Sequence, residues 1–163
     1  MKIIKRELKN YEIIQLFNEF VDGFNKEGLN AKYSLMLYKN IEVLTPIYNK
    51  IVSLIYNENY DEEYQKYLTA MKETMAKYAD RTDQGDIIQD EHGHIRITEM
   101  IVEFNAAKEA IENTYKDALF RFSHKDAVNR QVENSSQEVE LVGLELDEFP
   151  DKAKPFVVGL LTL

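Results

Sequence analysis

The sequence contains no cysteine, and this absence excludes disulfide bonds, zinc–thiolate sites and cysteine nucleophiles. Long hydrophobic runs are also missing, since the longest, Phe156–Leu161, is far too short to span a bilayer. Charged residues follow Ile3 and Ile4 directly, so the N-terminus lacks the apolar stretch of a signal peptide. These absences predict a cytoplasmic protein without a membrane partner, and the lack of cysteine fits a reducing compartment.

Glycine is scarce, and the motifs of common enzyme classes are missing. The six glycines form neither a phosphate-binding loop nor a dinucleotide-binding fingerprint. No serine lies in a Gly-x-Ser-x-Gly turn, and His124 beside Ser123 has no acidic partner that the sequence reveals. The many carboxylates are typical of solvated helix faces and single out no acid–base pair. We therefore expect a non-enzymatic protein with no catalytic residue and no cofactor.

Negative charge is abundant and unevenly distributed. The net charge is -9. Residues 1–56 carry eight Lys/Arg and six Asp/Glu, whereas residues 57–163 carry twelve Lys/Arg and twenty-three Asp/Glu. Such a surface repels phosphate backbones, so direct nucleic-acid binding is not expected. The acidic part would suit a basic partner or would imitate nucleic acid. The simpler interpretation is that the charge keeps the protein soluble.

Chain length and composition bound the fold. A chain of 163 residues with 44% hydrophobic and 30% charged residues predicts one globular domain, 1–163, with a single core. We expect a predominantly helical α+β fold, with three to four long helices in a bundle or a helical hairpin and a small antiparallel sheet. The predicted parts are a helical core over 8–122, a turn or hairpin insert over 80–97, and a C-terminal strand and short helix over 137–163.

Helical periodicity organises most of the chain. Apolar residues at helical spacing predict helices over 11–24, 31–57, 61–79 and 98–122. Pro46 interrupts the second stretch and leaves two interpretations open: Thr45–Pro46 begins a new helix, or one long helix is kinked near the proline. No period holds over 123–137, and 134–137 is expected to be a mobile loop.

Extended structure is predicted in three places. The stretch 139–146 alternates as a half-buried strand does, and 2–8 fits a strand or an extended arm. The stretch 86–97 fits a small β-hairpin around a glycine-containing turn. We expect these pieces to share one sheet, and Pro155 to start a short helix that ends at Leu161.

One loop has the spacing of a cation site. In Asp80–Glu91, glycine stands at position six and glutamate at position twelve, as in an EF-hand. Thr82 and Gln84 stand where carboxylates are needed, so a plain turn is favoured over calcium. His92 and His94 alternate along an extended chain and suit a transition metal, although exposed turn residues are the simpler interpretation. The metal candidates are Asp80, Asp86, Glu91, His92 and His94, and no bound metal is expected.

Tyrosine is abundant, with ten residues concentrated in the first half of the chain. Tyrosine is favoured at protein interfaces because it joins apolar area to a polar tip. The alternative interpretation is that half of them complete the helical core. The interface candidates are Tyr33, Tyr38, Tyr56, Tyr60 and Tyr67.

Several short motifs occur in a recognisable order along the chain. They are Lys77–Asp80, Asp83–Gly85, Asp90–Ile95, Phe104–Asn105 and Glu138–Leu141. Their order resembles a class of small uncharacterised proteins of tailed phages and prophages from low-GC bacteria, over most of residues 35–161. The N-terminal helix is not part of that pattern, and the class supplies no activity and no functional residue.

The leading functional hypothesis follows from this resemblance and from the absence of catalytic motifs. It is a phage-encoded interaction or structural protein in the host cytoplasm, as a virion component or an assembly accessory factor. Its partners would be phage structural proteins or a second copy of the chain. The alternative is an acidic inhibitor of a host defence or nucleic-acid-binding enzyme, which would use its carboxylates as a phosphate mimic.

Overall fold

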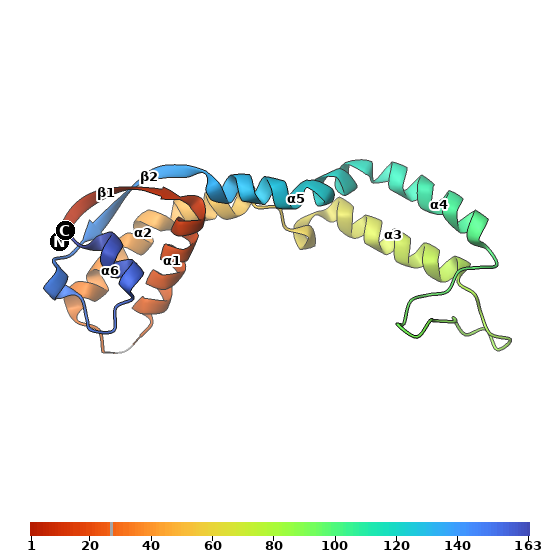
Figure 1. Ribbon diagram of the computed structural model, residues 1–163, viewed down its shortest axis with the longest axis horizontal. Coiled ribbons are helices and arrows are strands. Elements are labelled where there is room, and N and C mark those ends of the chain that lie inside the picture. Colours follow the sequence, from red (N-terminus) through yellow and green to blue (C-terminus); the bar gives the residue numbers. More distant parts are fainter. Residues whose placement is uncertain (27) are drawn as a thin grey trace. The chain divides into compact units, whose positions relative to one another are not determined.

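The computed structural model describes residues 1–26 and 28–163 and confirms the predominantly helical α+β class (Figure 1). The chain forms two compact units: unit 1 comprises Met1–Tyr56 and Ala127–Leu163, and unit 2 comprises Asn57–Asp126. The single domain inferred from chain length stays a prediction, because two compact units can still fold cooperatively. No helix in the described ranges has both the length and the apolar character needed to cross a membrane.

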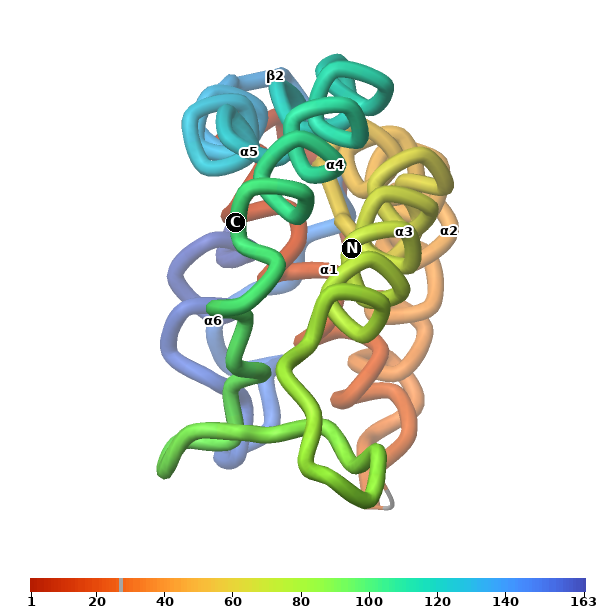
Figure 2. The backbone as a smooth tube through the Cα atoms, turned by 90° about the vertical axis from the view of Figure 1, so that its right-hand side faces the viewer, coloured from red at the N-terminus to blue at the C-terminus, as the bar shows by residue number. Residues whose placement is uncertain are grey.

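Two long helices build most of the core of unit 1. Helix α1 (Asn10–Phe24) buries Ile13, Leu16 and Phe20. Helix α2 (Ala31–Leu54) faces it, and the two helices lie side by side in Figures 1 and 2. Helix α2 is continuous through Pro46, so the two-helix interpretation is wrong. The Thr45 hydroxyl caps no new helix and donates instead to the carbonyl of Ile41, at 2.7 Å.

A two-stranded antiparallel sheet completes unit 1. Strand β1 (Lys2–Lys9) pairs with strand β2 (Ser136–Gly143), with Ile4 opposite Leu141. The predicted alternation is present in β2, where Val139 and Leu141 are buried and Glu138 and Glu140 are exposed. The arm interpretation of residues 2–8 is therefore wrong, and the strand interpretation is confirmed.

The C-terminal segment packs directly on the end of β2. Helix α6 (Pro155–Leu161) starts at the predicted proline and buries Val157 and Leu161. The amide of Leu144 donates to the carbonyl of Leu161, and the amide of Leu163 donates to the carbonyl of Leu144, both at 3.0 Å. Gly143 permits this approach, because a Cβ atom at that position would lie 2.6 Å from the carbonyl oxygen of Leu161.

The substitution Gly143→Ala is expected to lower the free energy of unfolding by about 1–3 kcal/mol, as overpacking does in cores. Gly159→Ala is the matched control, since its Cβ would meet nothing within 4 Å and alanine favours the helix in which it lies. Urea denaturation followed by circular dichroism measures both. Equal stability of the two variants would contradict the close approach at Gly143.

Unit 2 contains an antiparallel helical hairpin. A 3₁₀ turn, η1 (Glu58–Tyr60), precedes helix α3 (Glu62–Tyr78), and helix α4 (Ile101–Thr114) returns beside α3. Helix α5 (Lys116–Asn134) follows and contributes residues to both units. The prediction of one helix over 98–122 is wrong in two respects. The helix begins only at Ile101, and a break at Tyr115 divides it, so the described residues form five long helices rather than three or four.

The loop predicted at 134–137 is also wrong, and the stretch from 123 to 134, where no period holds, is helical. Helix α5 continues to Asn134, and β2 starts at Ser136. The side chain of Asn129 accepts from the amide of Tyr56 at 2.8 Å and donates to its carbonyl at 3.2 Å. The side chain of Asn10 donates to the carbonyl of Val132 at 2.7 Å. These contacts hold the end of α5 although its sequence carries no apolar stripe.

The 80–97 insert is paired as predicted but not with the main sheet. Isolated antiparallel bridges join Gln89 to Ile95 and Arg81 to Ile87. The insert belongs to unit 2, whereas the described sheet consists of β1 and β2 alone. The prediction that these pieces share one sheet is therefore wrong.

Candidate functional site

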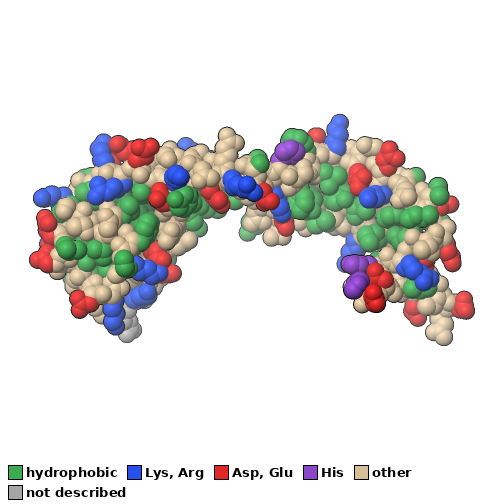
Figure 3. All heavy atoms as spheres, viewed as in Figure 1, with side chains coloured by type: hydrophobic (Ala, Val, Ile, Leu, Met, Phe, Trp, Pro, Cys, Tyr) green, Lys and Arg blue, Asp and Glu red, His purple; other side chains and the backbone are tan. Residues whose placement is uncertain are grey.

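The hairpin of unit 2 leaves much of its apolar surface uncovered. Tyr64 is the one buried residue of α3, and α4, which is described throughout, buries none. Val102 is 75% exposed, Phe120 63% and Tyr60 85%. Figure 3 shows hydrophobic side chains at the surface of α3 and α4. The exposed large apolar residues of unit 2 are spread over η1, α3, the start of α4 and α5, and we call them together the hairpin surface: Tyr60, Leu68, Met100, Ile101, Val102 and Phe120.

Aromatic contacts hold the inner side of the hairpin together. The rings of Tyr64 and Phe122 stack with centroids 4.3 Å apart. Tyr67 meets the edge of Tyr115 at 6.3 Å, and Tyr78 meets the edge of Phe104 at 6.4 Å. These pairs add specific geometry to the apolar burial between the helices. None of these three ring pairs includes a residue of the hairpin surface.

Charge in unit 2 is strongly acidic. Its residues include sixteen Asp/Glu and nine Lys/Arg. Some of the cations are already paired: Arg121 donates to Asp61 at 2.9 Å and to Glu63 at 2.7 Å, and Lys125 donates to Glu58 at 2.6 Å. The hydrogen bonds that Arg121 donates to Asp61, and then to Glu63, raise the pKa of Arg121 further above its usual range. Unit 2 therefore joins exposed apolar residues to an excess of carboxylates, which suits a partner that carries Lys and Arg beside an apolar patch.

Asp80 organises the insert that connects α3 to α4. One carboxylate oxygen accepts from the amides of Thr98 and Glu99, at 2.9 and 3.1 Å. The other accepts from the Thr98 hydroxyl at 2.6 Å and from Nε of Arg96 at 2.8 Å. Asp80 also donates its amide to the carbonyl of Arg96 and accepts from the amide of Ile88. The carboxylate, 3% exposed, is therefore a structural acceptor rather than an open ligand.

The other metal candidates lie on the insert without forming a cluster. Nδ1 of His94 lies 3.2 Å from Asp90, and Nε2 of His92 lies 3.5 Å from Glu91. Backbone hydrogen bonds, first from His94, lower the pKa of Asp90. Asp86 is exposed and bonds to Thr82 through its backbone. In the described part of the chain, no group of three or more His, Asp or Glu is arranged to hold a metal ion.

The five tyrosine candidates are divided between the units and differ in exposure. Tyr33, Tyr38 and Tyr56 belong to unit 1, and Tyr60 and Tyr67 belong to unit 2. Tyr33 is buried against Phe149, as the core interpretation predicts, and Tyr56 and Tyr67 are half-buried. Tyr38 is 46% exposed and donates to Glu42 at 2.8 Å. Tyr60 alone of the five lies in the hairpin surface.

Sequence reasoning named Asp80 only as a metal candidate and missed its structural role, and it missed most of the hairpin surface. A signal was present for the surface, since Met100, Ile101 and Val102 are three consecutive apolar residues at a helix start, and a helix cannot bury all three side chains on one face. The structural role of Asp80 carried no signal, because its partners lie 16 to 19 residues away. Comparison with known proteins adds no assignment: no family model, curated protein or solved structure matches the chain.

Proposed function

We propose that this is a non-enzymatic, phage-encoded interaction or structural protein, a virion component or an assembly accessory factor in the host cytoplasm. The hairpin surface carries the proposal. A pair of helices can bury only the faces that meet, and stable helical folds cover the remaining apolar area with a further layer. Unit 2 leaves Val102 largely exposed and covers Phe120 only in part, with the ring of His124, so a partner protein would supply the missing layer.

The partner chemistry follows from the charge around the hairpin surface. An excess of carboxylates favours a protein that offers an apolar patch bordered by Lys and Arg. A second copy would bring two acidic units together, and this repulsion disfavours self-association through the hairpin surface. The resemblance to phage proteins supports the choice of a virion or assembly protein as this partner.

The substitution Val102→Asp is expected to reduce partner affinity at least about tenfold, because it places a charge among the apolar residues of the proposed interface. Val102 is 75% exposed, so the fold should tolerate the change. The measurement is affinity purification from infected and uninfected cells, with mass spectrometry of the retained proteins. Leu146→Asp is the matched control, since Leu146 is 65% exposed and belongs to unit 1.

Two outcomes of this purification contradict the proposal. Retention of virion proteins by Val102→Asp at the wild-type level would show that the hairpin surface does not bind them. Retention of a basic host protein without infection would favour the acidic inhibitor. The exposed carboxylates Glu99, Glu103 and Glu109 support that second candidate. Its binding would fall steeply with salt and with the replacement of these three residues by glutamine.

A further inference from the structure

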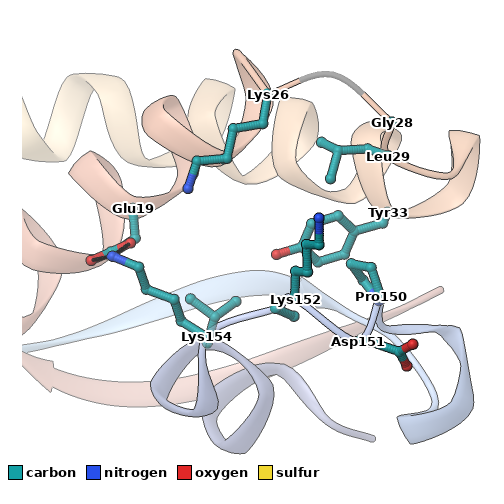
Figure 4. A pocket seen from close by; sticks show the side chains of 12 residues that line it. Glu19, Lys26, Gly28, Leu29, Tyr33, Pro150, Asp151, Lys152 and Lys154 are labelled. Carbon is teal, nitrogen blue, oxygen red and sulfur yellow. Dashed lines mark hydrogen bonds and ion pairs between the residues drawn. The ribbon is translucent and has the colours of Figure 1, made fainter.

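Unit 1 contains a pocket that the proposed function does not use. Its volume is about 590 Å³, within the usual range for small-molecule sites. The pocket lies between the α1–α2 connection and the segment before α6 (Figure 4). Leu29, Pro150, Ala153 and Val157 give it apolar walls. All of its lining residues belong to unit 1.

Three polar groups in the pocket have no partner among the residues that the structure describes. Lys154 is paired with Glu19, but Lys26 and Lys152 make no ion pair with any residue that the structure describes. The hydroxyl of Tyr33 points into the pocket in Figure 4 and makes no hydrogen bond within the described ranges. In the described ranges no buried side-chain N or O atom lacks a hydrogen-bond partner, so this hydroxyl is open to the pocket rather than sealed from water. A hydroxyl in a pocket wall can donate to a ligand that replaces water there.

The charge of the pocket favours an anion. Burial, followed by the charge of Glu19, raises the pKa of Tyr33, so its hydroxyl stays protonated and is a hydrogen-bond donor. Lys26 and Lys152 add two ammonium groups that pair with no carboxylate of the described residues. Asp151 also lines the pocket, but its carboxylate is directed away from Tyr33 in Figure 4. The chain as a whole has a net charge of -9, so two unpaired cations in one pocket run against its general acidity.

We propose that this pocket binds a small organic phosphate, with the phosphate between Lys26, Lys152 and Tyr33 and the organic part against the apolar walls. A phosphate offers three strong acceptor oxygens and nearly two negative charges, which match two ammonium groups and one hydroxyl donor. A carboxylate carries half that charge and leaves one ammonium group uncompensated. The pocket volume leaves room for an organic group about as large as an aromatic ring or a nucleoside.

Phenyl phosphate is the minimal probe, because it joins a dianion to an apolar ring. Isothermal titration calorimetry measures its affinity, and the amide shifts of Gly23 and Gly28 in NMR spectra locate its site. We expect saturable binding at least about tenfold tighter than that of inorganic phosphate, benzoate or benzyl alcohol. Inorganic phosphate lacks the apolar ring, benzoate carries a single negative charge, and benzyl alcohol carries no charge.

Variants assign the binding to the named residues. The double variant Lys26→Gln/Lys152→Gln is expected to weaken phenyl phosphate binding at least about tenfold. Tyr33→Phe keeps the buried ring, removes only the hydroxyl and should weaken binding about threefold or more. Lys50→Gln is the matched control, because Lys50 is an exposed lysine of unit 1 outside the pocket. Circular dichroism verifies that every variant is folded.

Three outcomes would overturn the proposal. Benzyl alcohol binding as tightly as phenyl phosphate would show an apolar site without anion recognition. Benzoate binding equally well would remove the assignment to phosphate. Unchanged affinity in the double variant would place the anion elsewhere. None of these outcomes bears on the hairpin surface, so this proposal and the proposed function fail independently.

Discussion

Replacing Asp80 by asparagine is expected to open the 80–99 segment of unit 2 while α3 and α4 stay helical. The Asp80 carboxylate accepts four hydrogen bonds, from two backbone amides, one hydroxyl and the guanidinium of Arg96. An asparagine side chain has only one oxygen to accept with. Its NH₂ group would replace the other oxygen and would point at groups that themselves donate. At least two of the four hydrogen bonds, and the charge pairing with Arg96, are then lost.

Amide hydrogen exchange measures this opening residue by residue. We expect exchange at the amides of Thr98 and Glu99 to accelerate at least about tenfold in Asp80→Asn, because both amides lose a charged acceptor. Asp83→Asn is the control: Asp83 is an exposed residue of the same insert, and no side-chain hydrogen bond is seen for it among the described residues. Unchanged protection of Thr98 and Glu99 in Asp80→Asn would refute the role of the carboxylate.

The same site predicts a pH dependence with a defined sign. Hydrogen bonds from the Thr98 hydroxyl and amide, and then from Glu99 and Arg96, hold the pKa of Asp80 well below its usual value of 3.8, against the opposing effect of burial. The unfolded chain therefore binds this proton more readily than the folded one. The stabilisation is complete above about pH 5 and is lost as pH falls from 3.8 towards the lowered pKa of the folded state. The difference in unfolding free energy between wild type and Asp80→Asn should shrink over that interval.

Elements that bury one regular face were predictable from the sequence. Helix α1 places Ile13 and Phe20 on its buried side, and β2 alternates buried Val139 and Leu141 with exposed glutamates. Such patterns are local, because the period of the chain itself decides which side chains share a face. The class of the fold followed from them, as did the helix that begins at Pro155.

Elements stabilised by distant polar contacts were not predictable in this way. The second half of α5 shows no apolar period because most of its side chains are exposed. Instead, Asn129 bonds to Tyr56, which is 73 positions away in the sequence, and Val132 bonds to Asn10, which is 122 positions away. Thr98 illustrates the same limit. It resembles a helix N-cap, but its hydroxyl donates to Asp80, and the helix starts three residues later.

The candidate sites show a related limit. Periodicity identified Ile101 as part of an inward stripe, yet Ile101 is 41% exposed, because a two-helix hairpin has only one covered side. The sequence shows that a residue is apolar but not whether a second layer exists to cover it. The pocket of unit 1 was hidden for another reason: Lys26, Tyr33 and Lys152 come from three segments, and no motif joins them.

Replacing the side-chain amide of Asn40 by an apolar group of similar size is expected to lower the stability of unit 1 strongly. Asn40 is fully buried in α2, where its oxygen accepts from the amide of Val142 at 2.7 Å and its NH₂ group donates to the carbonyl of Val142 at 3.0 Å. The side chain thus takes the place of a third strand along the edge of β2 that β1 does not occupy. In Asn40→Leu both backbone groups lose their partner, at a cost of about 2–4 kcal/mol in the free energy of unfolding.

Urea denaturation compares Asn40→Leu with Asn49→Leu, a control at an exposed position of the same helix that should change stability by less than about 0.5 kcal/mol. A loss below about 1 kcal/mol at Asn40 would contradict the strand-like pairing. Asn40→Asp tests the donor separately. An ionised carboxylate can accept from the Val142 amide but cannot donate to its carbonyl, whereas a protonated carboxyl does both. Relative to wild type, Asn40→Asp should therefore be least stable near neutral pH and should recover as the pH is lowered and the buried carboxyl takes up its proton.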